Sequence, residues 1–141
     1  MKQTIKTTIA MVLALMLALC MISCNTVEKT GIWENATYRK DMEFGKGATT
    51  VQVEVKAEEQ SVTFTLHTDK TILADALLEH ELIAGDEGAF GLYVKVVNGI
   101  TADYDVDQSY WALTKNGEML MTGVSGVTVA DGEHYELTRK K

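Results

Sequence analysis

The 141-residue sequence has no proline, only two cysteines and only three histidines. Two cysteines do not make a disulfide framework, and so few thiol and imidazole groups argue against a thiolate zinc site. Basic residues are also in deficit, because 13 lysines and arginines stand against 20 aspartates and glutamates, for a net charge of −7. A chain this acidic disfavours nucleic acid as a partner. With no proline and 11 glycines, the sequence is typical of regular strands joined by glycine turns rather than of a disordered tail.

Long apolar sequence occurs only at the N-terminus. Lys2 and Lys6 are followed by an unbroken apolar run over residues 9–19, which is too short to span a bilayer comfortably but typical of the core of a secretory signal. Residues 21–24, Met-Ile-Ser-Cys, resemble the bacterial lipobox. That resemblance implies that the thiol of Cys24 receives a diacylglycerol and becomes the mature N-terminus. The alternative is an ordinary signal peptide, or an uncleaved anchor, in which Cys24 is incidental.

These features predict three segments. Residues 1–23 are a lipoprotein signal peptide, residues 24–49 a lipid-anchored tether that partly docks, and residues 50–141 a folded domain. The expected location is extracytoplasmic, with membrane lipid on Cys24 holding the protein to the bacterial cell membrane.

Hydrophobic periodicity defines the elements of the folded domain. A spacing of 3.6 residues after residue 69 predicts one amphipathic helix of about 13 residues, which Gly85 ends. Strands on both sides of this helix predict an α+β fold, a β-grasp-like mixed sheet with the helix packed on its inner face. Alternating apolar and polar residues place the strands at 51–56, 61–67, 92–97, 110–114 and 135–137. The predicted core consists of Phe64, Leu66, Leu73, Leu77, Val94, Trp111 and Leu137.

No set of residues suited to catalysis is found. Aspartates alternate over residues 103–107 as in a calcium-binding loop, but the glycine and glutamate that the loop requires are replaced by Gln108 and Thr114. The three histidines fall on three different predicted elements without paired spacing, which supports neither a metal site nor a general base. The serines lack a credible base. We therefore predict a protein that is not an enzyme and that needs no cofactor or metal.

The sheet face turned away from the helix is the candidate ligand site. The strands at 92–97 and 110–114 would present Tyr93 and Tyr110 there, beside Ala112, and the loop after the first of them adds Asn98 and Tyr104 at the rim. Such a face suits a flat, partly apolar ligand or a partner protein. The alternative is that the tether covers this face, with Trp33 or Tyr38 packing on it.

Five short motifs then follow one another: Gly91-x-x-Val94, Asn98-Gly99-Ile100-x-Ala102, Tyr110-Trp111-x-Leu113, Leu120-x-x-Gly123-Val124 and Asp131-Gly132-Glu133-x-x-Glu136-Leu137. In this order and spacing they resemble the C-terminal domain of transcobalamin and intrinsic factor, a domain that bacteria carry in lipoproteins of unknown function. The resemblance covers residues 50–139. It implies a compact β-rich domain and a corrinoid such as cobalamin as a candidate ligand, although Ala112 stands where the cobalamin carriers commonly have glutamine.

Two functions are therefore expected. In the first, a cell-surface lipoprotein binds a small amphipathic ligand non-covalently, corrinoid-like if the resemblance extends to the ligand, and hands it to a membrane transporter. In the alternative, the domain is a protein–protein interaction module on the cell surface with no small-molecule ligand.

Overall fold

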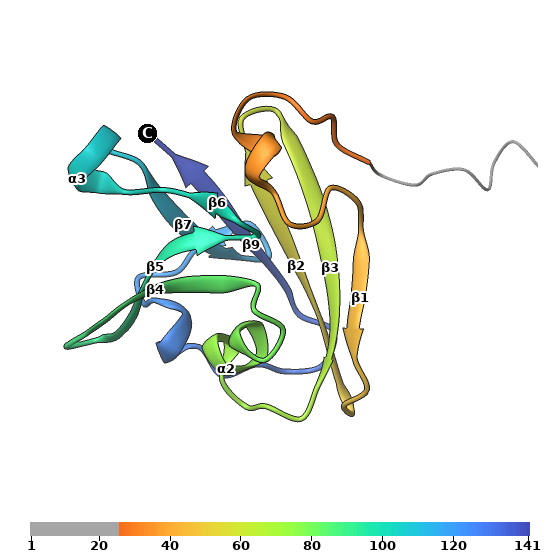
Figure 1. Cartoon of the computed structure of the whole chain (residues 1–141). Coiled ribbons are helices and arrows are strands. Elements are labelled where there is room, and N and C mark those ends of the chain that lie inside the picture. Colours follow the sequence, from red (N-terminus) through yellow and green to blue (C-terminus); the bar gives the residue numbers. More distant parts are fainter. Residues whose placement is uncertain (1–25) are drawn as a thin grey trace, which may run out of the picture.

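The computed structural model describes residues 26–141 (Figure 1), so the predicted signal peptide and the predicted lipidation site Cys24 lie outside the described residues. The described part is a mixed α+β structure made mostly of strands, which confirms the predicted fold class. None of its helices is long and apolar enough to cross a bilayer.

The main sheet has six strands in the order β1-β3-β2-β9-β7-β8. It is mixed, because β1 runs parallel to β3 and β2 runs parallel to β9, while the other neighbours are antiparallel. The strands predicted at 51–56 and 61–67 pair in it as an antiparallel hairpin, and Val53 lies opposite Phe64 with both side chains buried. The strands are β1 Met42–Gly45, β2 Thr49–Ala57, β3 Gln60–Thr68, β7 Tyr110–Lys115, β8 Glu118–Met119 and β9 His134–Lys140.

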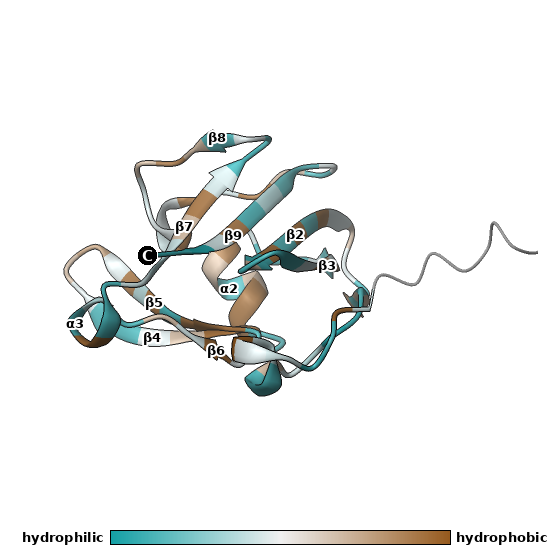
Figure 2. Ribbon diagram, turned by 90° about the horizontal axis from the view of Figure 1, so that it is seen from above, coloured by the Kyte–Doolittle hydropathy of each residue, from teal (hydrophilic) through white to brown (hydrophobic). Residues whose placement is uncertain are grey.

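A second sheet of three strands, in the order β4-β5-β6, faces the main sheet. Figure 2 shows the two sheets as separate layers, and helix α2 lies at one end of the space between them (Figure 1). The elements outside the main sheet are β4 Ile83–Gly88, β5 Gly91–Val97, β6 Ile100–Thr101, α2 Leu73–Leu78, α3 Tyr104–Asp107 and the 3-10 helices η1 Gly31–Asn35 and η2 Val124–Gly126. Because the strands divide between two sheets, the single β-grasp-like sheet is not confirmed.

The helix is shorter than the sequence predicts. It ends at Leu78, where the backbone amide of Leu82 donates to the carbonyl of Leu77 and that of Glu81 donates to the carbonyl of Leu78. Glu81 has φ = 55°, so it provides the left-handed residue that closes such an ending. The prediction that Gly85 ends the helix is therefore wrong, and Gly85 lies in β4.

The hydrophobic core fills the space between the two sheets and α2. Five of the seven predicted core residues are buried, whereas Val94 and Trp111 are only partly buried. Those two residues lie where the sheets separate, and this separation creates the site described below.

Residues 26–49 pack against the domain along the β3 edge of the main sheet. Trp33 is fully buried and its indole Nε1 donates to the carbonyl of Ala57 at 2.9 Å. Tyr38 meets Phe44 and Phe64 edge to face, with ring centroids 5.2 and 5.9 Å away. This segment therefore closes one side of the two-sheet structure, and of the residues predicted as a ligand site it contacts Asn98, through the backbone of Tyr38.

Candidate functional site

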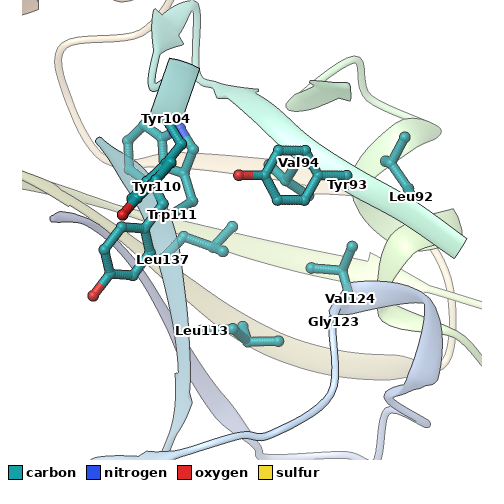
Figure 3. A pocket seen from close by; sticks show the side chains of 10 residues that line it. All are labelled: Leu92, Tyr93, Val94, Tyr104, Tyr110, Trp111, Leu113, Gly123, Val124 and Leu137. Carbon is teal, nitrogen blue, oxygen red and sulfur yellow. The ribbon is translucent and has the colours of Figure 1, made fainter. Parts of the chain in front are cut away.

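A cleft opens between β5 and β7, on the side of the molecule that the N-terminal segment leaves uncovered. Its volume is about 380 Å³. Elements far apart in the sequence contribute to it: β5, α3, β7, the turn into η2, and β9. The lining residues are Leu92, Tyr93, Val94, Tyr104, Tyr110, Trp111, Leu113, Gly123, Val124 and Leu137 (Figure 3).

The cleft lies between two strand edges that are paired only in part. β5 pairs with β6 only at Val96 and Val97, and β7 pairs with β8 only at Thr114 and Lys115. The remaining lengths of these two edges face each other across the gap. Because side chains from both faces of a strand are accessible along a free edge, consecutive residues of β5 and β7 line the same cleft.

Contacts between the sheets limit the width of the opening. The indole Nε1 of Trp111 donates to the carbonyl of Lys95 at 3.3 Å, which ties β7 to β5. Arg139 on β9 donates from Nε to the carbonyl of Thr101 and from Nη2 to Asp107 Oδ2, each at 2.9 Å. These hydrogen bonds hold β6 and α3 against the main sheet, so the end of the cleft near α3 is built on fixed elements.

Aromatic side chains dominate one end of the cleft. Figure 3 shows Tyr104, Tyr110 and Trp111 gathered there, and Tyr93 points its hydroxyl toward them from β5. The other end is aliphatic and includes Val124. Tyr93, Tyr104 and Tyr110 remain 50%, 57% and 40% exposed, so their rings are available to a ligand. An apolar cleft with several aromatic faces and a few hydroxyl groups suits a flat amphipathic molecule.

The lining carries no charged side chain, and charges at the rim compensate one another. Lys95 Nζ lies 2.9 Å from Asp86 Oδ2 and 3.6 Å from Asp103 Oδ2. The hydrogen bond to Asp86 and the charge of Asp103 raise the pKa of Lys95. On α3, hydrogen bonds from Ser109 lower the pKa of Asp107. Since these ions have partners within the protein, the cleft offers mainly apolar and stacking contacts.

The structure brings three of the five predicted ligand residues together and leaves two outside. Tyr93, Tyr104 and Tyr110 all line the cleft. Asn98 does not, because it is 1% exposed and its side-chain amide hydrogen-bonds the backbone of Tyr38. Ala112 does not either, because it lies opposite Thr138 on the outer face of the main sheet and is covered there.

The cleft also uses residues that the sequence assigned to the core. These are Val94, Trp111 and Leu137, which belong to the inner faces of their strands, as their alternation indicates. The alternation does not show that the two inner faces diverge and leave Val94 and Trp111 only partly buried. The site is therefore an opening into the core and not a face turned away from the helix.

The domain is similar to a known protein family and to solved structures. Residues 70–138 match the DUF4430 family, a domain of unknown function. A solved structure from Ruminococcus gnavus ATCC 29149, named as a candidate metal binding protein, is 34% identical and has a TM-score of 0.63, with 66% of this chain and 97% of that chain covered. No curated protein matches.

Haptocorrin in complex with Cbi is also similar, at 22% identity and a TM-score of 0.53, with 70% of this chain covered. The matched region spans 26% of the haptocorrin chain. At this identity the likeness concerns the fold alone, and it confirms the resemblance to the transcobalamin family that the sequence motifs indicate.

Proposed function

The chain belongs to the DUF4430 family, and from that premise we propose that its domain is a non-catalytic binding module whose cleft takes a small, flat, amphipathic ligand. The cleft itself is the observation that carries this proposal. Its volume of about 380 Å³ falls within the range of small-molecule sites, about 300–1,000 Å³. Three tyrosines and a tryptophan among its lining residues offer ring faces for stacking and hydroxyl groups for orientation.

A corrinoid is the first ligand class to test. The haptocorrin structure with this fold was solved with Cbi, and a flat, amide-bearing macrocycle matches a cleft of tyrosines and aliphatic groups. The cleft is at the small end of the range, so a molecule of that size would place only one edge inside it. We therefore expect micromolar rather than nanomolar affinity unless a partner covers the remainder.

The proposed cellular role rests on the N-terminal sequence. Lipid on Cys24 would hold the domain at the outer surface of the cell membrane, where it captures the ligand and passes it to a membrane transporter. A non-catalytic role is supported by the ten lining residues, which include no histidine, cysteine, serine, lysine, aspartate or glutamate. The same composition separates the cleft from metal binding, the property in the name of the Ruminococcus gnavus protein, because it offers no imidazole, thiolate or carboxylate.

A protein-docking function is the second candidate, and the rim of the cleft favours it. Phe90 is 99% exposed and Met121 is 96% exposed. Each lies within two residues of a lining residue, Leu92 or Gly123. Large apolar side chains so fully exposed, and close in sequence to lining residues of an apolar cleft, suit an interaction surface.

Calorimetry with hydroxocobalamin tests the first function. The chain from residue 24 onward, with Cys24→Ser to remove the lipidation thiol, should bind one equivalent with micromolar affinity. Tyr93→Ala and Tyr110→Ala should each weaken binding about fivefold, which corresponds to the loss of about 1 kcal/mol of aromatic contact. Phe90→Ala is the matched control, because it removes an exposed aromatic ring outside the lining.

The outcome of the hydroxocobalamin titration decides whether a corrinoid binds in the cleft. Absence of heat and of any thermal shift at millimolar hydroxocobalamin would exclude the corrinoid. Equal weakening by Phe90→Ala and Tyr93→Ala would contradict binding of hydroxocobalamin in the cleft, because Phe90 lies outside its lining.

A further inference from the structure

The outer face of the main sheet, which is separate from the cleft, brings together three side chains that can bind a metal. Glu54 on β2 lies in register with Glu136 on β9, because these two strands pair in parallel. His134 stands two residues before Glu136 on the same strand and therefore projects from the same face. One ligand atom from each of the three residues lies within 4.8 Å of the other two.

The distances among these atoms already approach those of a coordination shell. His134 Nε2 is 3.4 Å from Glu54 Oε2 and 3.9 Å from Glu136 Oε1. Bonds of about 2.0–2.2 Å from zinc to nitrogen and oxygen place neighbouring ligands of a tetrahedron about 3.3–3.6 Å apart. The two distances from His134 Nε2 are therefore close to this spacing, and rotation of the glutamate side chains can bring the three donors around one ion.

A neighbouring amide orients the imidazole toward the carboxylates. Gln52 lies opposite His134 in the register, and its Oε1 is 3.4 Å from His134 Nδ1. When Nδ1–H donates to this oxygen, Nε2 carries the lone pair and faces Glu54 and Glu136. A divalent metal ion can accept this lone pair and bind the two carboxylates, and a hydrogen bond of this kind on the far ring nitrogen accompanies most metal-bound histidines.

Lys56 is the counter-ion that a metal would replace. Its Nζ lies 3.2 Å from Glu136 Oε2 and 3.6 Å from Glu54 Oε2, and its side chain is 36% exposed. A long, partly exposed lysine can turn into solvent at low cost, so its ammonium competes with a metal without blocking it. Removing this competitor should increase metal affinity.

We propose that Glu54, His134 and Glu136 form a binding site for a divalent transition-metal ion, with Zn²⁺ as the reference case and water as the remaining ligand. One nitrogen and two carboxylate donors fit Zn²⁺ and its neighbours, whereas Ca²⁺ and Mg²⁺ favour shells made only of oxygen. This site is independent of the cleft and of its ligand. Sequence spacing does not reveal it, because Glu54 and His134 are 80 residues apart and only the parallel pairing joins them.

Titration with Zn²⁺ alone tests the proposal, with calorimetry and thermal unfolding as readouts. The chain from residue 24 onward carrying Cys24→Ser should bind one equivalent and unfold at a higher temperature with Zn²⁺ than with EDTA. His134→Gln and Glu54→Gln should each weaken binding by about tenfold or more. Lys56→Gln should bind several-fold more tightly, a gain that a folding defect cannot produce.

A second histidine on the same face supplies the matched control. His67 pairs with a single carboxylate, that of Glu43, and His67→Gln should leave Zn²⁺ affinity unchanged. The proposal is overturned if His134→Gln binds Zn²⁺ as tightly as the parent chain, if Lys56→Gln binds it more weakly, or if His67→Gln abolishes binding. Because hydroxocobalamin binding is measured separately, a negative result for the metal site does not affect the test of the cleft, and the reverse also holds.

Discussion

Asn98 fixes the N-terminal segment to the second sheet. Its Oδ1 accepts a hydrogen bond from the backbone amide of Tyr38 at 2.8 Å, and its Nδ2 donates to the carbonyl of Tyr38 at 2.7 Å. Asn98 is 1% exposed, so water cannot readily replace either partner. Its φ of 52° is left-handed, a conformation that asparagine tolerates better than most residues.

Asn98→Gly should lower the free energy of unfolding by about 2–3 kcal/mol, because two partly buried backbone groups of Tyr38 lose their partners. Glycine keeps the left-handed backbone free of strain, so the loss reports on the amide. Asn116→Gly is the control, since Asn116 has φ = 50° but is exposed in a turn. Urea unfolding at constant m measures both variants, and equal effects of the two would contradict the structural role of the Asn98 amide.

Glu133 predicts a pH dependence of stability. Partial burial works to raise its pKa, but hydrogen bonds from Lys115, Tyr135 and the backbone amide of Ala130 outweigh burial and lower it. A carboxyl group whose pKa is lowered by folding stabilises the protein above its unfolded pKa of about 4.3, and this contribution is lost as the pH falls through the folded value. The stability difference between the parent chain and Glu133→Gln should therefore shrink below about pH 4.3. Urea unfolding at several pH values measures it, and a difference that grows on acidification would refute the assignment.

Single residues show which parts of the candidate site can be predicted from the sequence and which cannot. Tyr93, Tyr104 and Tyr110, which line the cleft, could be predicted as site residues because they stand at polar positions of strands or in a loop, where burial does not explain them. From the sequence, Asn98 is an equally plausible ligand residue, because it lies in the loop after the strand at 92–97. What the sequence cannot show is that Tyr38, 60 residues earlier, lies over that loop and occupies the amide.

At the scale of elements, strands follow from the sequence more closely than the helix does. The alternation that predicts 51–56 and 61–67 continues through most of β2 and β3, because each strand buries one face. The 3.6-residue period after residue 69 also extends through residues that leave α2 and enter β4. β4 itself carries no alternation, since only Ile83 is buried. A strand that buries so little has no hydrophobic period to detect.

Gly85 allows β4 and β5 to approach each other. A Cβ at this position would lie 1.9 Å from the carbonyl oxygen of Tyr93, at a point where the register of the two strands shifts. Gly85→Ala should therefore destabilise the protein by about 1–3 kcal/mol and displace Tyr93 in the cleft. Gly88→Ala in the same strand is the control, because its Cβ would meet the carbonyl oxygen of Gly91 at an ordinary 3.6 Å. Thermal unfolding of the two variants measures the difference, and equal stability would contradict the close approach.

At the scale of the whole molecule, the two sheets are held together unevenly. Residues 26–49 close the β3 side with the buried Trp33 and with the Tyr38–Phe44–Phe64 cluster. The β5–β7 side stays open and forms the cleft. The sequence identifies the apolar inner faces, but the distance between two layers depends on contacts between distant segments, which a periodic pattern does not encode.

This uneven closure predicts an order of amide exchange. The central strands β2, β3 and β9 each have a neighbour on both sides, so their amides should exchange slowest, at rates set by global unfolding. β4 has a single neighbour and one buried residue out of six. It should therefore open first, together with its partner β5, and the amides of these two strands should exchange fastest. Hydrogen exchange followed by mass spectrometry measures this order.

A ligand bound in the cleft should slow exchange in β5 and α3 and leave β1 and β3 unchanged, because it would join the two layers only on their open side. Protection that appears instead along β1 and β3 would mean that the ligand binds on the closed side and that the cleft is not its site.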